Sequence, residues 1–272
     1  MPAIGPQTRP KTTPPTPDTE DGHGARMGFF DHFNELRRRV TRAFLGVLVG
    51  TVIGAIFAEQ ALAYLGRPYL GVTGETQFLI IDVTGSVVAY FRVALLIGGT
   101  LAVPIVTYQL VMFVLPAMTK RERRFFLLAM PAVFILFLIG VAFAWFVLIP
   151  PALSFLEGFQ SELFRTEWEA SRYISFTTSL LFWMGVAFET PLVLFILSLI
   201  GFVTARPLIK NWRLAIVISA VAAAMITPTI DPVNMGLVMG PLLVLYVISI
   251  FLVMIGTRMH RRDHDSQRSP QV

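Results

Sequence analysis

Long apolar runs separated by short polar segments cover most of this chain. Six of these runs can form helices, at about residues 43–58, 86–115, 125–149, 173–203, 214–227 and 234–256. At a rise of ~1.5 Å per helical residue, about 20 residues cross the ~30 Å hydrocarbon core of a bilayer. The fifth run reaches only ~21 Å, which requires either a longer helix or a locally thinned bilayer. The pattern predicts an all-α integral membrane protein with six transmembrane helices.

The same pattern divides the chain into three parts. Residues 1–27 contain six prolines and scattered threonines without an apolar centre, which predicts a disordered tail and not a cleavable signal peptide. Residues 28–257 hold the predicted spans, and residues 258–272 form a charged C-terminal tail. The two halves of the hydrophobic part show no repeat.

Composition supports the membrane assignment and excludes several kinds of chemistry. Hydrophobic residues make up 55% of the chain and charged residues 14%, against ~25% charged in a soluble domain. Cysteine is absent, so disulfides, thiolate nucleophiles and cysteine metal sites are excluded. The chain contains neither His-Glu-x-x-His nor Gly-x-Ser-x-Gly, and it has no phosphate-binding loop. We therefore expect no enzyme, no metal site and no cofactor.

Lysine and arginine predict the orientation. With the N-terminus inside, 18 of the 22 basic residues lie on the cytoplasmic side, and Arg67, Arg165 and Arg172 lie outside. The positive-inside rule then places both termini in the cytoplasm. The basic residues are divided among four short segments, which argues against nucleic acid as a partner.

One carboxylate lies in the middle of a charge-free run. The nearest charges to Glu189 are Arg172 and Arg206, each seventeen positions away. A charged group at the centre of a spanning helix costs ~2.5–3.5 kcal/mol on insertion scales, and such residues face protein or water. Glu189 either performs a task within the membrane or braces the bundle through a hydrogen bond.

Two further carboxylates lie among arginines on the predicted cytoplasmic side. Glu35 precedes three consecutive arginines, and Glu122 lies in the segment Lys-Arg-Glu-Arg-Arg between the second and third runs. These acids either moderate the repulsion between neighbouring bases or bind a basic peptide. Arginine suits the second alternative, because its planar guanidinium binds a carboxylate through two hydrogen bonds.

Glycines in the first run predict close helix packing. Gly46, Gly50 and Gly54 recur at four-residue spacing and form one smooth helix face. We expect this face to pack within the bundle and not to form a dimer seam.

Several of these segments resemble the TatC family, the large subunit of the twin-arginine protein translocase. The similar segments are His32 to Val40, Pro104 to Gln109, Phe113 to Pro116, Glu122 to Arg124, Gly185 to Pro191, and Thr227-Pro228 with Asp231. They occur in the family's order and cover residues 28 to 256. The resemblance implies a concave, cupped bundle of six helices in the inner membrane of a prokaryote.

The resemblance also assigns roles to residues. Glu35 and Glu122 would bind the paired arginines of a twin-arginine signal peptide, and Leu36, Arg37 and Phe113 would shape that site. Glu189 and Gln109 would form an intramembrane polar site for single-span partners of the TatA and TatB type. Pro68 and Asp231 would belong to the periplasmic cap.

These roles imply a receptor that works with other subunits, in several copies, to export folded proteins using the protonmotive force. The alternative is a proton-coupled secondary transporter with Glu189 as its ion site. Such transporters usually contain internal repeats and several polar groups at the membrane midplane. A solute transporter also has no need of Glu35 and Glu122.

Overall fold

The computed structural model describes residues 29–74, 78–114, 120–159, 168–227 and 231–268. Side chains are described throughout these ranges except at 29–32, 70, 72–73, 114, 120–129 and 260–268. The predicted disordered tail, residues 1–27, lies outside the described residues. Within them the chain is helical, and the one β-type contact is an isolated bridge between Leu79 and Glu169.

Ten helical elements follow one another along the described part of the chain. Proline lies inside four of the longest helices, α3, α4, α6 and α9. The elements are α1 (Phe29–Leu65), α2 (Arg67–Thr73), α3 (Gly85–Val114), α4 (Lys120–Phe143), the π-helix η1 (Ala144–Leu148), α5 (Ile149–Gly158), α6 (Ala170–Leu199), α7 (Ala205–Lys210), α8 (Trp212–Ile226) and α9 (Pro232–Arg268).

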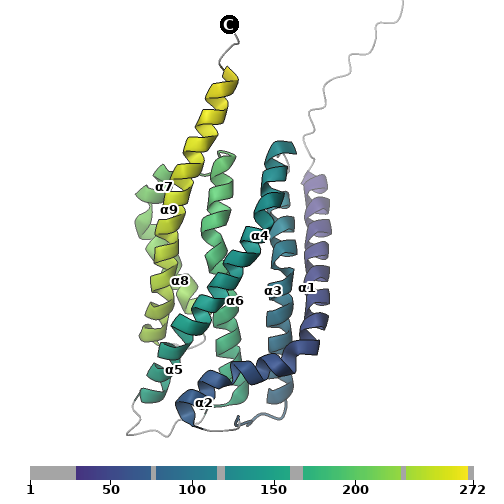
Figure 1. The fold of residues 1–272 in the computed structure, drawn as a ribbon, viewed down its shortest axis with the longest axis vertical. Coiled ribbons are helices and arrows are strands. Elements are labelled where there is room, and N and C mark those ends of the chain that lie inside the picture. Colours follow the sequence, from purple (N-terminus) through teal and green to yellow (C-terminus); the bar gives the residue numbers. More distant parts are fainter. Residues whose placement is uncertain (1–28, 75–77, 115–119, 160–167, 228–230, 269–272) are drawn as a thin grey trace, which may run out of the picture.

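The helices stand side by side between two ends of the bundle (Figure 1). We call the end that contains the start of α1 and the C-terminal part of α9 the terminal end, and the end that contains α2 and α5 the loop end. Successive long helices alternate in direction between these ends (Figure 1). The packing order is α1, α3, α6, α9 and α8, and α4 crosses α6.

Five helices in the described part of the chain are long and apolar enough to cross a membrane, and α8 is too short to be among them. At fifteen residues, α8 covers ~22 Å. It begins at Trp212, after a break at Asn211, and ends at Ile226, so it is only one residue longer than the apolar run that predicted it. The helix thus starts two residues before its predicted limit, but this extension leaves it shorter than the ~30 Å hydrocarbon core. The third span continues through η1 into α5 and ends at Gly158, nine residues beyond its predicted limit.

The glycines of α1 pack against α3, as their spacing predicts. A Cβ atom added to Gly50 would lie 2.5 Å from the carbonyl oxygen of Gly98, and one added to Gly54 would meet the carbonyl oxygen of Ala94. In return, a Cβ on Gly98 would meet the backbone of Thr51. The two helices approach until their backbones touch, so this face is internal packing.

A second close contact joins α6 and α9 near the terminal end. A Cβ atom on Gly256 would collide with the Ser198 hydroxyl, and Phe195 lies on the other side. Beyond Gly256, α9 continues as a helix to Arg268 and projects past the other helices (Figure 1). The charged segment that begins at residue 258 therefore continues α9.

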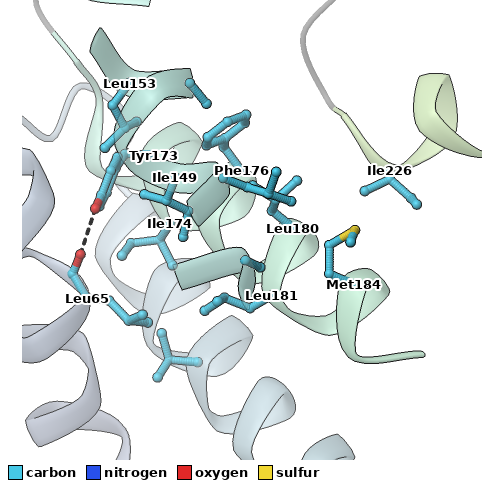
Figure 2. Close-up of a cluster of buried hydrophobic side chains, with 14 of the residues drawn as sticks. Leu65, Ile149, Leu153, Tyr173, Ile174, Phe176, Leu180, Leu181, Met184 and Ile226 are labelled. Carbon is cyan, nitrogen blue, oxygen red and sulfur yellow. Dashed lines mark hydrogen bonds between the residues drawn. The ribbon is translucent and has the colours of Figure 1, made fainter. Parts of the chain in front are cut away.

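The main hydrophobic core lies in the half of the bundle nearer the loop end. It combines buried residues of α1, α3, η1, α5, α6, α8 and α9, including Ile149, Ile174 and Met184 (Figure 2). In the half nearer the terminal end, a small cluster forms around Val111 and Ile196. A further cluster contains Val103, Val133 and Phe137.

Tyr173 binds the C-terminal end of α1 within the main core. Its hydroxyl donates a hydrogen bond of 2.6 Å to the carbonyl oxygen of Leu65 (Figure 2). Leu65 is the last residue of α1, and the last four carbonyls of a helix have no partner within it. The bond therefore links α6 to the C-terminal turn of α1.

Tyr173→Phe is expected to lower the free energy of unfolding by about 1–3 kcal/mol, because a buried carbonyl loses its donor. Thermal unfolding of the purified protein in detergent measures the change. Tyr64→Phe is the matched control, since Tyr64 is exposed. Equal unfolding temperatures for the two variants would contradict the role given to the Tyr173 hydroxyl.

Candidate functional site

Glu35 lies in the second turn of α1 at the terminal end. One carboxylate oxygen, Oε1, accepts a hydrogen bond of 2.9 Å from Nε of Arg39 and a second bond from its Nη2. This ion pair has the favourable i, i+4 order, with the acid on the N-terminal side. The other oxygen, Oε2, is buried and has no hydrogen-bond partner among the described residues. Glu35 is thus half satisfied.

The neighbours of Glu35 divide between apolar and cationic positions. Leu36 is half-buried, and Arg37 is exposed. Arg37 uses its backbone carbonyl to accept a hydrogen bond from the Thr41 hydroxyl. Arg37 is two positions from Glu35 and therefore leaves α1 about 200° around the helix from it, with its guanidinium exposed to solvent.

Phe113 and Glu122 lie at the same end of the bundle as Glu35. Phe113 is half-buried in the last turn of α3, which packs against α1. Glu122 belongs to the first turn of α4, and its side chain lies outside the described residues. The start of α1, the end of α3 and the start of α4 all lie at the terminal end (Figure 1), so the three positions lie at the same end of the bundle.

Glu189 lies on α6, where this helix packs against α3. Its side chain is 9% exposed. Oε2 accepts a hydrogen bond of 3.2 Å from the hydroxyl of Thr107, 82 positions earlier in the chain. Oε1 is buried and has no hydrogen-bond partner in the described part of the protein. Like Glu35, this carboxylate keeps one oxygen unused.

Pro191 adds a second polar atom to this part of α6. Proline has no N–H group, so the carbonyl of Ala187, four residues earlier, loses its usual partner within the helix. Pro191 is buried, and Glu189 lies between the two residues along the chain. The apolar span is therefore interrupted by a carboxylate and a backbone carbonyl within one turn.

Thr107 was not predicted from the sequence, which instead grouped Gln109 with Glu189. Residues two apart on a helix leave it about 200° apart, so only one of the two can face Glu189. The structure brings Thr107 to the carboxylate. Gln109 is half-buried, and its Oε1 is buried without a hydrogen-bond partner among the described residues. The available signal for Thr107 was a hydroxyl residue in the same apolar run, directly before Tyr108 and Gln109.

The predicted cap residues both lie at the loop end. Asp231 immediately precedes α9, and its two carboxylate oxygens accept hydrogen bonds from the backbone N–H (2.7 Å) and the side-chain amide (2.9 Å) of Asn234. With Pro232 as the first helical residue, this is an N-cap, a type of contact worth about 1 kcal/mol. Pro68 is the second residue of α2 and lines a groove together with Tyr64 and Trp145.

Metal binding finds no support in the described ranges. They contain no group of three or more histidine, cysteine, aspartate or glutamate side chains that could hold an ion.

Comparison with known proteins identifies the family. The sequence profile of the Sec-independent protein translocase protein (TatC) matches residues 31–241. The chain belongs to the TatC family. It is 36% identical to a Sec-independent protein translocase protein TatC of Desulforapulum autotrophicum over 241 residues, which cover 88% of this chain and 87% of that protein. It is 33% identical to a TatC of Synechocystis sp. over 220 residues, covering 81% of this chain and 85% of the relative.

Solved TatC structures have the same fold. A crystal structure of the twin-arginine translocase receptor TatC superposes with a TM-score of 0.75 at 34% identity, covering 84% of this chain and 100% of the solved one. The resemblance stated from sequence motifs is thus confirmed, as is the all-α fold. This TatC-family chain is a membrane protein of twin-arginine translocation, a translocase component and not an enzyme.

Proposed function

We propose that this chain is the receptor subunit of a twin-arginine translocase and binds signal peptides at its terminal end. The observation that carries the proposal is the half-satisfied carboxylate of Glu35. Arg39 holds one oxygen in place, and the buried second oxygen has no partner among the described residues. A guanidinium from a peptide would supply the missing charge-assisted hydrogen bond.

The peptide has two consecutive arginines, and a second carboxylate is needed for the second guanidinium. Glu122 supplies it from the first turn of α4. Leu36 and Phe113 contact the apolar part of the peptide, and the exposed Arg37 repels peptides that approach in the wrong register.

The terminal end faces the cytoplasm of a prokaryote, and the protein spans its inner membrane six times. Two observations support this orientation. The long helices alternate in direction (Figure 1). With α8 counted beside the five longer helices, the chain crosses six times, which leaves both termini on the same side. Eighteen of the 22 basic residues then lie inside, as the positive-inside rule requires. The shortness of α8 is accommodated by local thinning of the bilayer.

Glu189 serves assembly and not recognition. Its free oxygen lies in an apolar span, where a polar partner strengthens a helix contact that dispersion alone would leave weak. Single-span helices of the TatA and TatB type would gather around this carboxylate on the concave face. Gln109 would offer a separate polar contact on another face of α3, since Thr107 occupies the face toward Glu189. Several copies of the complex then export folded cargo using the protonmotive force. Pro68 and Asp231 hold the periplasmic cap in shape.

The test is photocrosslinking of a twin-arginine signal peptide to membranes that contain this protein. Glu35→Ala and Glu122→Ala are each expected to weaken binding by about tenfold or more, because one charge-assisted hydrogen bond to a buried charge is worth about 1.5–3 kcal/mol. Glu59→Ala is the matched control, since Glu59 is an exposed carboxylate near the other end of α1.

A twin-lysine peptide provides the second control, because an ammonium group lacks the planar, fixed set of N–H donors of a guanidinium. We expect this peptide to bind as weakly to the parent protein as the twin-arginine peptide binds to Glu35→Ala. If Glu35→Ala, Glu122→Ala and Glu59→Ala all bind like the parent, recognition does not lie on these carboxylates.

A further inference from the structure

A groove opens at the loop end, away from Glu35 and Glu189. It lies between the last turn of α1 and α2 on one side and η1 and α5 on the other, and its volume is about 370 Å³. The volume falls in the range of small-ligand sites, ~300–1,000 Å³. The roles proposed above leave this groove without an occupant.

Aromatic rings form the walls of the groove. Tyr64 and Trp145 stack with ring centroids 5.0 Å apart and an interplanar angle of 23°. Phe146, the next residue, is 68% exposed. Both Trp145 and Phe146 belong to η1, and a π-helical turn holds more residues than an α-helical one, which changes the direction of the side chains that follow. This π-helical turn thus supplies two consecutive aromatic residues to the groove.

A single cation lies at the edge of these rings. The guanidinium carbon of Arg67 lies 4.8 Å from the centroid of Tyr64. A guanidinium that stacks through its flat face keeps its N–H groups, which point outward in the plane, for other partners. Arg67 is exposed and forms no ion pair within the described ranges. Ser154 adds an exposed hydroxyl to the same groove.

These groups are complementary to an anion attached to an apolar chain. Arginine binds phosphate through parallel hydrogen bonds. Tyrosine and tryptophan concentrate at the depth of lipid head groups, where their rings contact chains and their polar atoms contact water. The exposed Phe146 and the exposed apolar side chains of α1, such as Ile56 and Phe57, continue the apolar surface away from Arg67. A free phosphate ion would use Arg67 and leave the rings without a ligand.

We propose that this groove binds an anionic phospholipid, whose phosphate contacts Arg67 and Ser154 and whose acyl chain lies against Trp145 and Phe146. In the orientation given above, the lipid belongs to the outer leaflet. The site is separate from signal-peptide recognition and requires only that the bundle lie in a membrane. The bound lipid fills the space between α2, which includes Pro68, and the facing side formed by η1 and α5.

The test uses Trp145 as the reporter. The chain has four tryptophans, and replacing Trp168, Trp183 and Trp212 with phenylalanine leaves Trp145 alone. The protein is placed in phosphatidylcholine vesicles with a small mole fraction of either brominated phosphatidylglycerol or brominated phosphatidylcholine. Bromine on the acyl chain quenches Trp145 on contact, so the ratio of the two quenching curves gives the preference for the anionic lipid.

We expect phosphatidylglycerol to quench more strongly, and Arg67→Gln to reduce that preference about threefold, the value of one partly exposed charged contact. Arg172→Gln is the matched control. Arg172 is a second exposed arginine near the loop end, paired with Glu169 at 3.0 Å and outside the groove. It should leave the preference unchanged, and inorganic phosphate should not displace the lipid.

Equal quenching by the two lipids, or equal effects of Arg67→Gln and Arg172→Gln, would overturn the proposal. The groove would then hold lipid without preference for its head group, or a polypeptide. A second measurement keeps all four tryptophans in case the triple replacement does not fold. Phosphatidylglycerol with a photoactivatable head group should crosslink to peptides of α2 and α5 in the parent protein. Crosslinks at the terminal end alone would contradict the site.

Discussion

Replacing Glu189 with leucine is expected to reduce export of a folded twin-arginine cargo by about tenfold or more, an effect equal to ~1.4 kcal/mol. The reason is the position of the carboxylate on α6, buried, held by Thr107 and with one oxygen unused. Leucine fills the space without any polar atom for a partner helix. Transport into energised inverted membrane vesicles measures the loss.

Two controls separate this role from folding and from recognition. Thr190→Leu makes a similar change one residue away at an exposed position and should transport like the parent. Crosslinking of the signal peptide to Glu189→Leu should also match the parent, because Glu35 and Glu122 are unchanged. Normal export by Glu189→Leu would show that the carboxylate only braces α3 against α6.

Glu189→Gln distinguishes hydrogen bonding from charge. The amide keeps the shape of the side chain, and its oxygen can still accept the Thr107 bond. If hydrogen bonding to partner helices is sufficient, this variant retains most of the transport that leucine removes. If the negative charge is required, the two variants fail alike.

Gly50→Leu is expected to disrupt the protein itself. Even a Cβ atom at this position would lie 2.5 Å from the Gly98 carbonyl oxygen, so a leucine must force α1 away from α3. Overpacking costs about 1–3 kcal/mol where neighbours can shift, and a backbone carbonyl of another helix shifts less readily than a side chain. We expect a lower unfolding temperature in detergent and less full-length protein in membranes.

Gly236→Leu is the matched control for this change. Gly236 lies in α9 and is exposed, and a Cβ atom added to it would meet no other atom within 4 Å. Leucine also has a better helix propensity than glycine by roughly 0.8 kcal/mol. The control should therefore be as stable as the parent or slightly more so. Similar losses in both variants would mean that the α1–α3 contact is not the cause.

The hydrophobic pattern was sufficient to predict most of the helices, because a bilayer demands long apolar segments with satisfied backbones. The limits of the helices were harder to predict. The third span extends through η1 to Gly158 because Pro150 and Pro151 fall near a helix start, where proline is tolerated. The sequence prediction ended the span at Ile149, directly before these two prolines.

Contacts within one helix could also be read from spacing, and contacts between helices could not. Glu35 and Arg39 are four residues apart, so their pairing follows from helix geometry. Four-residue spacing likewise marked the glycine face of α1, but nothing in it pointed to Gly98 as the surface opposite. Thr107 and Glu189 are 82 positions apart, and only the packing of α3 on α6 brings them together.

The helix α9 is much longer than a single membrane crossing requires. Its 37 residues measure ~55 Å, against ~30 Å for the hydrocarbon core. Gly256 packs directly against Ser198 with no room for a methyl group, so this contact holds α9 against the end of α6. Because the helix continues from Gly256 to Arg268, a small change in the tilt of α9 would displace its charged C-terminal end.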